Sequence, residues 1–219
     1  MSKNLSLETQ PIEILIPWFF LIILLLFTYA YLFEVPYVGF DFNLLTGEVL
    51  EKFVDASAEH DLRVGDCILQ VGSVRWEEYR LDAHRPVLRG VKPGEVIPMR
   101  VERGGQTLDL VWEIPGFNAK EFLSRLIDFW WLGYLFWVFG TILAVFVRPK
   151  DTLWLLLVLF MNFFAIFIHF GVISRWRVWG SAVLFGMVAW LLVPISLHLH
   201  WFFPKPLGRL PVKVSYGVY

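Results

Sequence analysis

The sequence predicts a membrane α-helical protein with four transmembrane helices and a small mixed β/α domain inserted after the first of them. Three observations support this fold class. The 219 residues are 57% hydrophobic, against about 45–50% for a typical soluble domain, and the 11 tryptophans are of a type that favours membrane interfaces. Four long runs contain no Asp, Glu, Lys or Arg. Residues 34–128 have 17 acidic and 11 basic side chains, whereas the rest of the chain has 3 and 8.

The first uncharged run, 14–33, predicts a membrane anchor. At a rise of about 1.5 Å per residue, a helix of this length crosses a hydrocarbon core of about 30 Å. A cleaved signal peptide is the alternative, but the run is long for one, only Lys3 precedes it as a basic residue, and no small-residue cleavage pattern follows. We therefore expect residues 1–13 to form a terminus and Pro17 to lie in the first turn of a retained helix.

Three further uncharged runs predict the remaining transmembrane helices. They are residues 129–147, 152–173 and 178–203. The short links 148–151 and 174–177 require consecutive helices to run antiparallel. Pro194 lies inside the last run, which membrane helices tolerate. Close helix packing is predicted at Gly133, Gly140, Gly180 and Gly186.

Lysine and arginine in the short loops predict the orientation, because cytoplasmic loops are enriched in these residues. A cytoplasmic N-terminus places six of them inside and two outside, and the reverse orientation inverts that ratio. The six are Lys3, Arg148, Lys150, Lys205, Arg209 and Lys213, and the two are Arg175 and Arg177. We therefore expect cytoplasmic termini, including the tail 204–219, and an extracytoplasmic domain at 34–116.

Residues 117–128 join this domain to the second transmembrane run. Apolar side chains recur at helical spacing in this segment, at Phe122, Leu123, Leu126 and Ile127. The pattern is typical of an amphipathic helix on a membrane surface. An extension of the following transmembrane helix remains an equal alternative.

The inserted domain reads as short strands separated by turns. Strand-like runs occur at 38–42, 67–71, 96–102 and 108–114, and Gly47 opens a further strand. Gly104-Gly105 lies between the last two runs, which predicts a β-hairpin. The single cysteine, Cys67, allows no disulfide within the chain.

Four motifs in the inserted domain resemble those of bacterial PDZ domains, in the same order and spacing. They are Tyr37-Val38-Gly39-Phe40, then Leu62-Arg63-Val64-Gly65-Asp66-Cys67-Ile68-Leu69-Gln70-Val71, then Pro93-Gly94-Glu95-Val96, and finally Arg103-Gly104-Gly105. The structural element Gly65-Asp66 is the most specific of them. The resemblance implies a PDZ-like fold for residues 34–116.

The resemblance also implies a peptide-binding groove. In such domains a peptide adds as an extra strand, and backbone N–H groups of the glycine loop bind its terminal carboxylate. The corresponding residues are Tyr37, Val38, Gly39, Phe40, Asp41 and Phe42, with amide donors at Val38, Gly39 and Phe40. The second wall would be a helix near 83–88, which Pro86 interrupts. Because the loop lies close to the first membrane run, we expect a membrane-associated or lipidated peptide, or another segment of this chain, as ligand.

The sequence contains no recognisable catalytic constellation. It has no His-Glu-x-x-His, no Gly-x-Ser-x-Gly and no phosphate-binding glycine loop, so we expect no enzymatic activity, metal or cofactor. The lack of a basic cluster also argues against nucleic acid.

Four polar residues within the membrane runs are candidates for a role of their own. They are Asn162, His169, His198 and His200. Asn162 and His169 are predicted to form interhelical hydrogen bonds, with a direct functional role as the alternative. We expect His198 and His200 to be interface anchors. The alternative is that one of them meets His169 at a metal or haem.

The end of the last run resembles a second family feature. Residues 197–206 read Leu-His-Leu-His-Trp-Phe-Phe-Pro-Lys-Pro, similar to a Leu-His-x-x-x-x-Phe-Pro-x-Pro run in membrane input regions of bacterial sensor histidine kinases. Competence-type kinases share the order of helix, PDZ domain and further helices. The kinase domains themselves do not occur in this sequence, so kinase activity would belong to a region beyond it.

The two resemblances together imply a ligand- or peptide-binding input module of a bacterial signalling protein in the plasma membrane. Its surroundings would be the lipid bilayer, and its partner a peptide or protein at the PDZ-like domain. The alternative is a non-catalytic accessory subunit that docks onto a larger membrane complex, with other membrane subunits or a second copy of the chain as partners.

Overall fold

The computed structural model describes residues 11–54, 61–86, 88 and 90–202. The chain divides into two compact units. The first, here called the helical unit, consists of Met1–Phe27, Phe129–Val172 and Leu184–Tyr219, as far as they are described. The second, the β unit, consists of Thr28–Asp128 and Ile173–Val183. The predicted terminus and tail lie largely outside the described residues.

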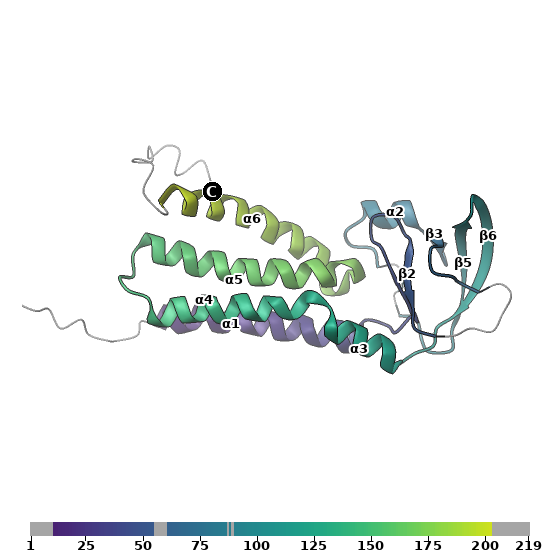
Figure 1. Cartoon of the computed structure of the whole chain (residues 1–219), viewed down its shortest axis with the longest axis horizontal. Helices are drawn as coiled ribbons and strands as arrows, with labels where there is room; N and C mark the ends of the chain where they lie inside the picture. Colours follow the sequence, from purple (N-terminus) through teal and green to yellow (C-terminus); the bar gives the residue numbers. More distant parts are fainter. Residues whose placement is uncertain (1–10, 55–60, 87, 89, 203–219) are drawn as a thin grey trace, which may run out of the picture. The chain divides into compact units, whose positions relative to one another are not determined.

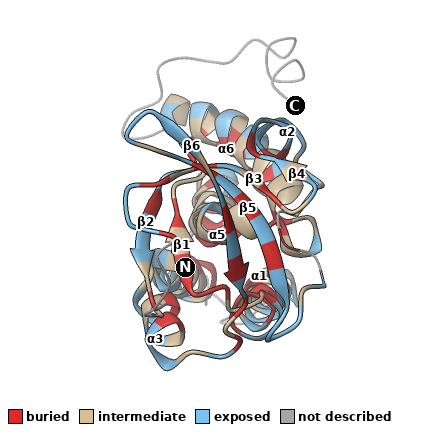
Figure 2. Ribbon diagram, turned by 90° about the vertical axis from the view of Figure 1, so that its right-hand side faces the viewer, coloured by how far each residue is buried: buried red, intermediate tan, exposed pale blue. Residues whose placement is uncertain are grey.

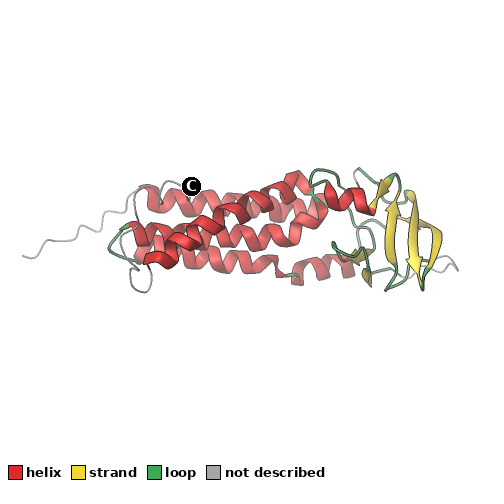
Figure 3. Ribbon diagram, turned by 90° about the horizontal axis from the view of Figure 1, so that it is seen from above, coloured by secondary structure: helices red, strands yellow, loops and turns green. Residues whose placement is uncertain are grey.

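Four helical stretches are long and apolar enough to cross a membrane, as predicted. These candidate spans are Glu13–Glu34, Ala119–Phe146, Thr152–Trp176 and Val178–Phe202. Their long helices are α1 (Pro11–Tyr29), α4 (Leu132–Phe146), α5 (Thr152–Ile173) and α6 (Ser181–Phe202), drawn in red in Figure 3. Shorter turns flank them: η1 (Ala30–Glu34), η2 (Phe129–Trp131), η3 (Ser174–Trp176) and η4 (Val178–Gly180). Helix length and composition therefore support a multi-pass membrane protein.

Pro17 lies in the interior of α1, so the prediction that it occupies the first turn is wrong. The helix begins at Pro11, several residues before the uncharged run. The backbone carbonyl of Pro17 accepts a hydrogen bond of 2.8 Å from the indole of Trp137 in α4. The helix thus continues past the proline, which membrane helices tolerate.

Two glycines of α4 allow it to pack closely against α5. A Cβ atom at Gly133 would lie 2.7 Å from a backbone oxygen of α5, and one at Gly140 would lie 2.7 Å from Nδ2 of Asn162. Predicted close packing is therefore confirmed at these two positions. It is wrong for Gly180 and Gly186, where an added Cβ would meet no described atom within 4 Å. Gly180 instead has a φ of +74° in a turn.

The β unit contains two antiparallel sheets. One pairs β1 (Phe40–Phe42) with β2 (Val49–Lys52), and the other has the strand order β4-β3-β5-β6. Figure 1 labels β2, β3, β5 and β6, and Figure 2 labels all six strands. The strands of the second sheet are β3 (Cys67–Val71), β4 (Val74–Arg75), β5 (Val96–Arg103) and β6 (Gln106–Glu113). The predicted β5–β6 hairpin turns at Gly104 and Gly105, whose φ values of +58° and +80° suit a tight hairpin.

One buried cluster connects both sheets of the β unit. It includes Phe40 of β1, Ile68 of β3, Val101 of β5 and Trp112 of β6. Burial alternates along β5, as the coloured bands in Figure 2 show, because successive side chains of a strand point to opposite faces. Trp176, which follows α5, packs against the same cluster.

The described residues of the helix expected near 83–88 are not helical. Residues 82–86 have no helical structure, consistent with the proline at position 86. The helix of this part of the chain is instead α2 (Trp76–Leu81), directly after β4.

Helix α3 (Ala119–Ile127) is separate from α4. The backbone leaves helical geometry at Asp128, with φ −57° and ψ 155°. Its N-terminus is capped by Asn118, whose side-chain oxygen accepts from the N–H groups of Lys120 and Glu121 at 2.8 and 3.3 Å. The candidate span Ala119–Phe146 nevertheless includes both helices, so the two alternatives for this segment stay open.

Candidate functional site

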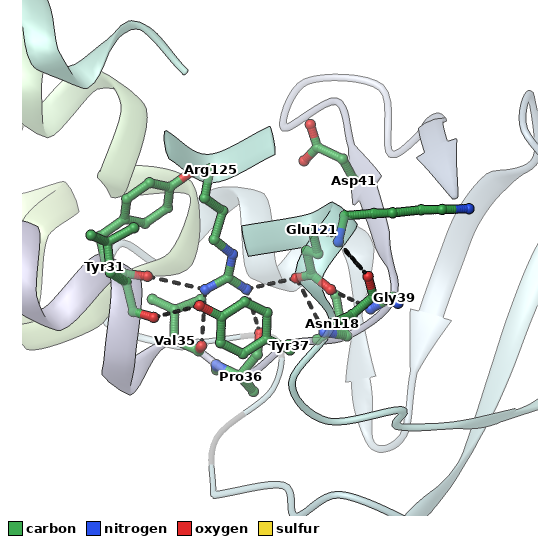
Figure 4. Close-up of polar contacts among 12 residues, drawn as sticks. Tyr31, Val35, Pro36, Tyr37, Gly39, Asp41, Asn118, Glu121 and Arg125 are labelled. Atoms are coloured by element: carbon green, nitrogen blue, oxygen red, sulfur yellow. Dashed lines mark hydrogen bonds and ion pairs between the residues drawn. The ribbon is translucent and has the colours of Figure 1, made fainter. Parts of the chain in front are cut away.

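The loop before β1 directs two backbone N–H groups at one carboxylate. Gly39 donates to Oε2 of Glu121 at 2.8 Å, and Val38 donates to Oε1 at 3.3 Å (Figure 4). Glu121 belongs to α3 of the same chain. Phe40, the third predicted donor, pairs with Lys52 in the β1–β2 sheet. Two of the amides predicted to bind a peptide carboxylate therefore bind an internal one; they are called the amide pair below.

Neighbouring contacts fix the conformation of the amide pair. Gly39 has a φ of +83°, and a Cβ there would come within 2.9 Å of two side chains, so a larger residue does not fit. Its carbonyl accepts from the N–H of Phe53 at 2.8 Å. The carbonyl of Val38 accepts from the Trp112 indole at 2.7 Å. These two bonds hold the backbone of the loop in a conformation in which both N–H groups face the carboxylate.

Arg125 completes the surroundings of the carboxylate. Its Nη2 donates to Oε1 of Glu121 at 2.7 Å, one helical turn away. The guanidinium also donates to the backbone carbonyls of Tyr31, Val35 and Pro36 at 3.0, 3.0 and 2.7 Å. It lies 4.1 Å from the ring centroid of Tyr37, a cation–π contact. The two charged side chains are only 4% and 2% exposed, so this pair is buried and well hydrogen-bonded.

A second arginine, Arg175, binds the loop and strand from the connection between α5 and α6. Its Nη1 lies 3.0 Å from Oδ1 of Asp41 in β1, and its Nη2 lies 2.8 Å from Oδ2 of Asp128. The hydroxyl of Tyr31 lies 3.3 Å from Nη2 and donates to Asp128 at 3.1 Å. This arginine therefore joins β1, the end of α3 and η1.

The next two residues contact both β1 and α2. The Trp176 ring packs edge-on against Phe42 at 5.3 Å. Arg177, with a left-handed φ of +53°, donates to the carbonyl of Tyr79 at 2.6 Å, and the Tyr79 hydroxyl donates to the carbonyl of Arg175. Burial raises the pKa of Tyr79 to about 12, although the charges of Arg177 and Arg175 oppose the rise. The hydroxyl therefore remains a donor at neutral pH.

Gly65 and Asp66 have a structural environment. Asp66 is 1% exposed and accepts two bonds of 2.7 Å from Arg103, at Oδ1 and Oδ2, and one of 2.8 Å from the N–H of Arg63. Burial would raise the pKa of the Asp66 carboxyl, but these hydrogen bonds and charges outweigh it and lower the pKa. Gly65 has a φ of +90°. The motif thus connects the turn before β3 to the end of β5.

The intramembrane polar candidates Asn162 and His169 are both fully buried in the helical unit. The side chain of Asn162 donates to the carbonyl of Val158 at 2.8 Å, within α5. His169 Nδ1 lies 3.3 Å from the carbonyl oxygen of Trp130, and its ring lies edge-on to Tyr134 at 6.0 Å. His169 therefore contacts the chain around the start of α4, whereas any functional role of the two stays a prediction.

His198 and His200 make contacts within α6. His198 stacks on Phe202 at 5.4 Å, and Nδ1 of His200 lies 2.7 Å from the carbonyl of Ser196. His169 is near the end of α5 and the other two are near the end of α6; because a short connection joins these helices, the two ends lie far apart. Within the described chain, no group of three or more His, Cys, Asp and Glu side chains could hold a metal ion.

Sequence reasoning missed the charged residues that surround the amide pair. Glu121 and Arg125 are spaced four apart in a helix, which is a recognisable ion-pair signal. Arg175 and Arg177 were read only as loop charges. No protein-family model, curated protein or solved structure matches this chain.

Proposed function

We propose that this chain is the ligand-input module of a signalling protein in a bacterial plasma membrane, and that its β unit binds a peptide or protein. One observation supports this most: arginine-centred networks in the β unit bind residues next to the ends of all four long helices. Arg125 joins α3, which leads into α4, to η1, which follows α1. Arg175 belongs to the connection between α5 and α6. A ligand that disturbs these networks would change the positions of helix ends.

A peptide is the proposed ligand because the amide pair already binds a carboxylate. Backbone N–H groups of a glycine loop bind the terminal carboxylate in PDZ domains, which this sequence resembles. Among the described strands, β1 pairs only with β2, so its other edge is the proposed place for an added strand. Coupling requires the ligand to bind one arrangement of the helix ends more tightly than another.

The extracytoplasmic orientation of the β unit is part of the proposal. Arg175 and Arg177 were the only loop cations counted on that side. Within the β unit, Arg175 forms an ion pair with Asp41 and Arg177 donates to the carbonyl of Tyr79. Arg148 and Lys150 are likewise paired, with Glu13, so the orientation rests on the count of loop lysines and arginines.

The test uses the full chain in lipid nanodiscs, with Cys67 replaced by alanine. Spin labels replace Leu123 of α3 and Trp179 of the connection, whose side chains are 56% and 49% exposed. A control pair replaces Val96 and Val111 in the β5–β6 hairpin, which are also exposed. The probe is a pool of hexapeptides with free C-terminal carboxylates, and the same pool with amidated ends is its control.

We expect the free-carboxylate pool to change the distance between the first label pair and to leave the hairpin pair unchanged. Peptide binding without such a change would contradict an input role. Stoichiometric co-purification with a larger membrane complex, together with no peptide binding, would support the accessory-subunit alternative instead.

A further inference from the structure

The carboxylate of Glu121 accepts from the two backbone N–H groups that the resemblance assigns to a peptide terminus, and the 175–177 segment contacts both β1 and α2. We propose that Glu121 and this segment form an internal ligand at the amide pair and β1, and that an external peptide binds by displacing Glu121 with its own C-terminal carboxylate. This inference rests on the proposed function and specifies how that site is regulated.

The environment of Glu121 is a general carboxylate site. One oxygen accepts from Gly39 at 2.8 Å, and the other accepts from Val38 at 3.3 Å and from Arg125 at 2.7 Å. Two loop N–H groups and a guanidinium recognise any carboxylate. An incoming peptide terminus would form the same hydrogen bonds, so the exchange would leave no donor of the site unsatisfied.

The remainder of α3 is attached to the β unit in a way that permits exchange. Its buried charged side chains are Glu121 and Arg125, whereas Leu123 and Ile127 on the same helix are 56% and 68% exposed. Arg125 keeps its bonds to the carbonyls of Tyr31, Val35 and Pro36, so the exchange releases the Glu121 side chain and the first turn of α3 while the guanidinium stays in the site. Asp128, where the backbone leaves helical geometry, connects α3 to η2 and α4, so a change in α3 can reach the end of α4.

The 175–177 segment makes side-chain contacts that an added strand could replace. Arg175 and Asp41 are 21% and 25% exposed at their ion pair. Trp176 covers Phe42, which lies on β1. An apolar peptide side chain at that position would bury the same ring.

The experiment removes the internal carboxylate in the full-length protein. Glu121→Ala should bind the free-carboxylate hexapeptides about tenfold more tightly than the wild type. This change in affinity corresponds to about one charge-assisted hydrogen bond. The amidated pool should show no gain. Acetate should raise the unfolding temperature of this variant and leave that of the wild type unchanged, whereas acetamide should affect neither.

The matched control is Glu113→Ala, which removes an exposed carboxylate of β6. It should bind the free-carboxylate pool with wild-type affinity and gain no stability from acetate. A Glu121→Ala protein that gains no affinity and no acetate stabilisation would overturn the inference.

A second measurement is available if Glu121→Ala fails to fold. Hydrogen exchange of wild-type α3 should accelerate when the free-carboxylate pool binds, with β5 and β6 unchanged; unchanged exchange in α3 would contradict displacement. The two proposals also fail separately. If acetate stabilises Glu121→Ala but the labelled helix ends do not move, the proposed input role is wrong. If the helix ends move but Glu121→Ala gains neither acetate stabilisation nor affinity, the proposed internal ligand is wrong.

Discussion

Two buried carboxylates of the β unit, Asp66 and Glu121, each bind an arginine but differ in what holds them. Asp66 accepts from Arg103 and from the N–H of Arg63, three residues before it. Its partners therefore belong to the same turn and to the sheet next to it. Glu121 comes from a helix far along the chain and binds loop amides that nothing local requires it to bind. Asp66 thus joins a turn to its own sheet, whereas Glu121 joins α3 to the loop before β1, and only the second contact is the subject of the displacement proposal.

Replacement of Asp66 by asparagine tests the structural role. Asp66→Asn keeps the shape of the side chain but removes the charge that accepts two bonds from Arg103. We expect the free energy of unfolding of the β unit to fall by about 2 kcal/mol, the usual contribution of hydrogen bonds to a charged group. Denaturant unfolding of the full chain in detergent measures it. Asp109→Asn, which removes the exposed Arg100 ion pair, is the control and should have little effect; equal losses would contradict the assignment.

The lowered pKa of Asp66 also predicts a pH dependence. Because the pKa of this carboxyl is lower in the folded state, the folded protein binds its proton less readily than the unfolded chain does. Asp66 therefore stabilises the fold above its unfolded pKa of about 3.9, and this stabilisation is lost as the pH falls through the lower folded pKa. Unfolding temperatures measured from neutral to acidic pH should fall less steeply for Asp66→Asn than for the wild type. Parallel curves would show that another group is responsible.

At the scale of elements, the sequence predicted the helices, strands and turns that are determined by residues close together in the chain. The β5–β6 hairpin follows from Gly104-Gly105, because both residues need positive φ. The buried face of α3 could not be predicted in the same way. Its apolar residues indicate an amphipathic helix, but apolar side chains can face lipid as well as protein. The buried residues of α3 are instead the charged Glu121 and Arg125.

The packing of α4 against α5 can be tested with one methyl group. Gly140→Ala would place a Cβ 2.7 Å from Nδ2 of Asn162, so the helices must separate or the asparagine must move. We expect a loss of stability of about 1–3 kcal/mol, typical of overpacking. Gly186→Ala is the control, since its Cβ meets no described atom within 4 Å. Thermal unfolding of both variants in nanodiscs makes the comparison, and equal stability of the two would show that this contact is loose.

At the scale of the whole molecule, hydropathy was sufficient to predict four membrane-length helices but not the division into units. The 173–183 connection belongs to the β unit, although the β strands precede it by many residues. This membership depends on contacts such as that between Trp176 and Phe42. Nothing in the sequence around Trp176 or Phe42 predicts that the two side chains meet, because such contacts form only through tertiary packing. The same reason explains why the internal carboxylate was not foreseen.

The orientation in the membrane decides whether an external ligand can meet the amide pair at all. In a Cys67→Ala background, Ser73→Cys places a thiol at an exposed position of the β unit, and Thr152→Cys places one at the exposed start of α5. We expect a membrane-impermeant maleimide to label Ser73→Cys in intact bacterial cells and to label Thr152→Cys only after permeabilisation. This follows because Arg148 and Lys150 adjoin position 152, and loops rich in such residues stay in the cytoplasm. The opposite pattern would place the β unit in the cytoplasm, where any carboxylate ligand would have to be an intracellular one.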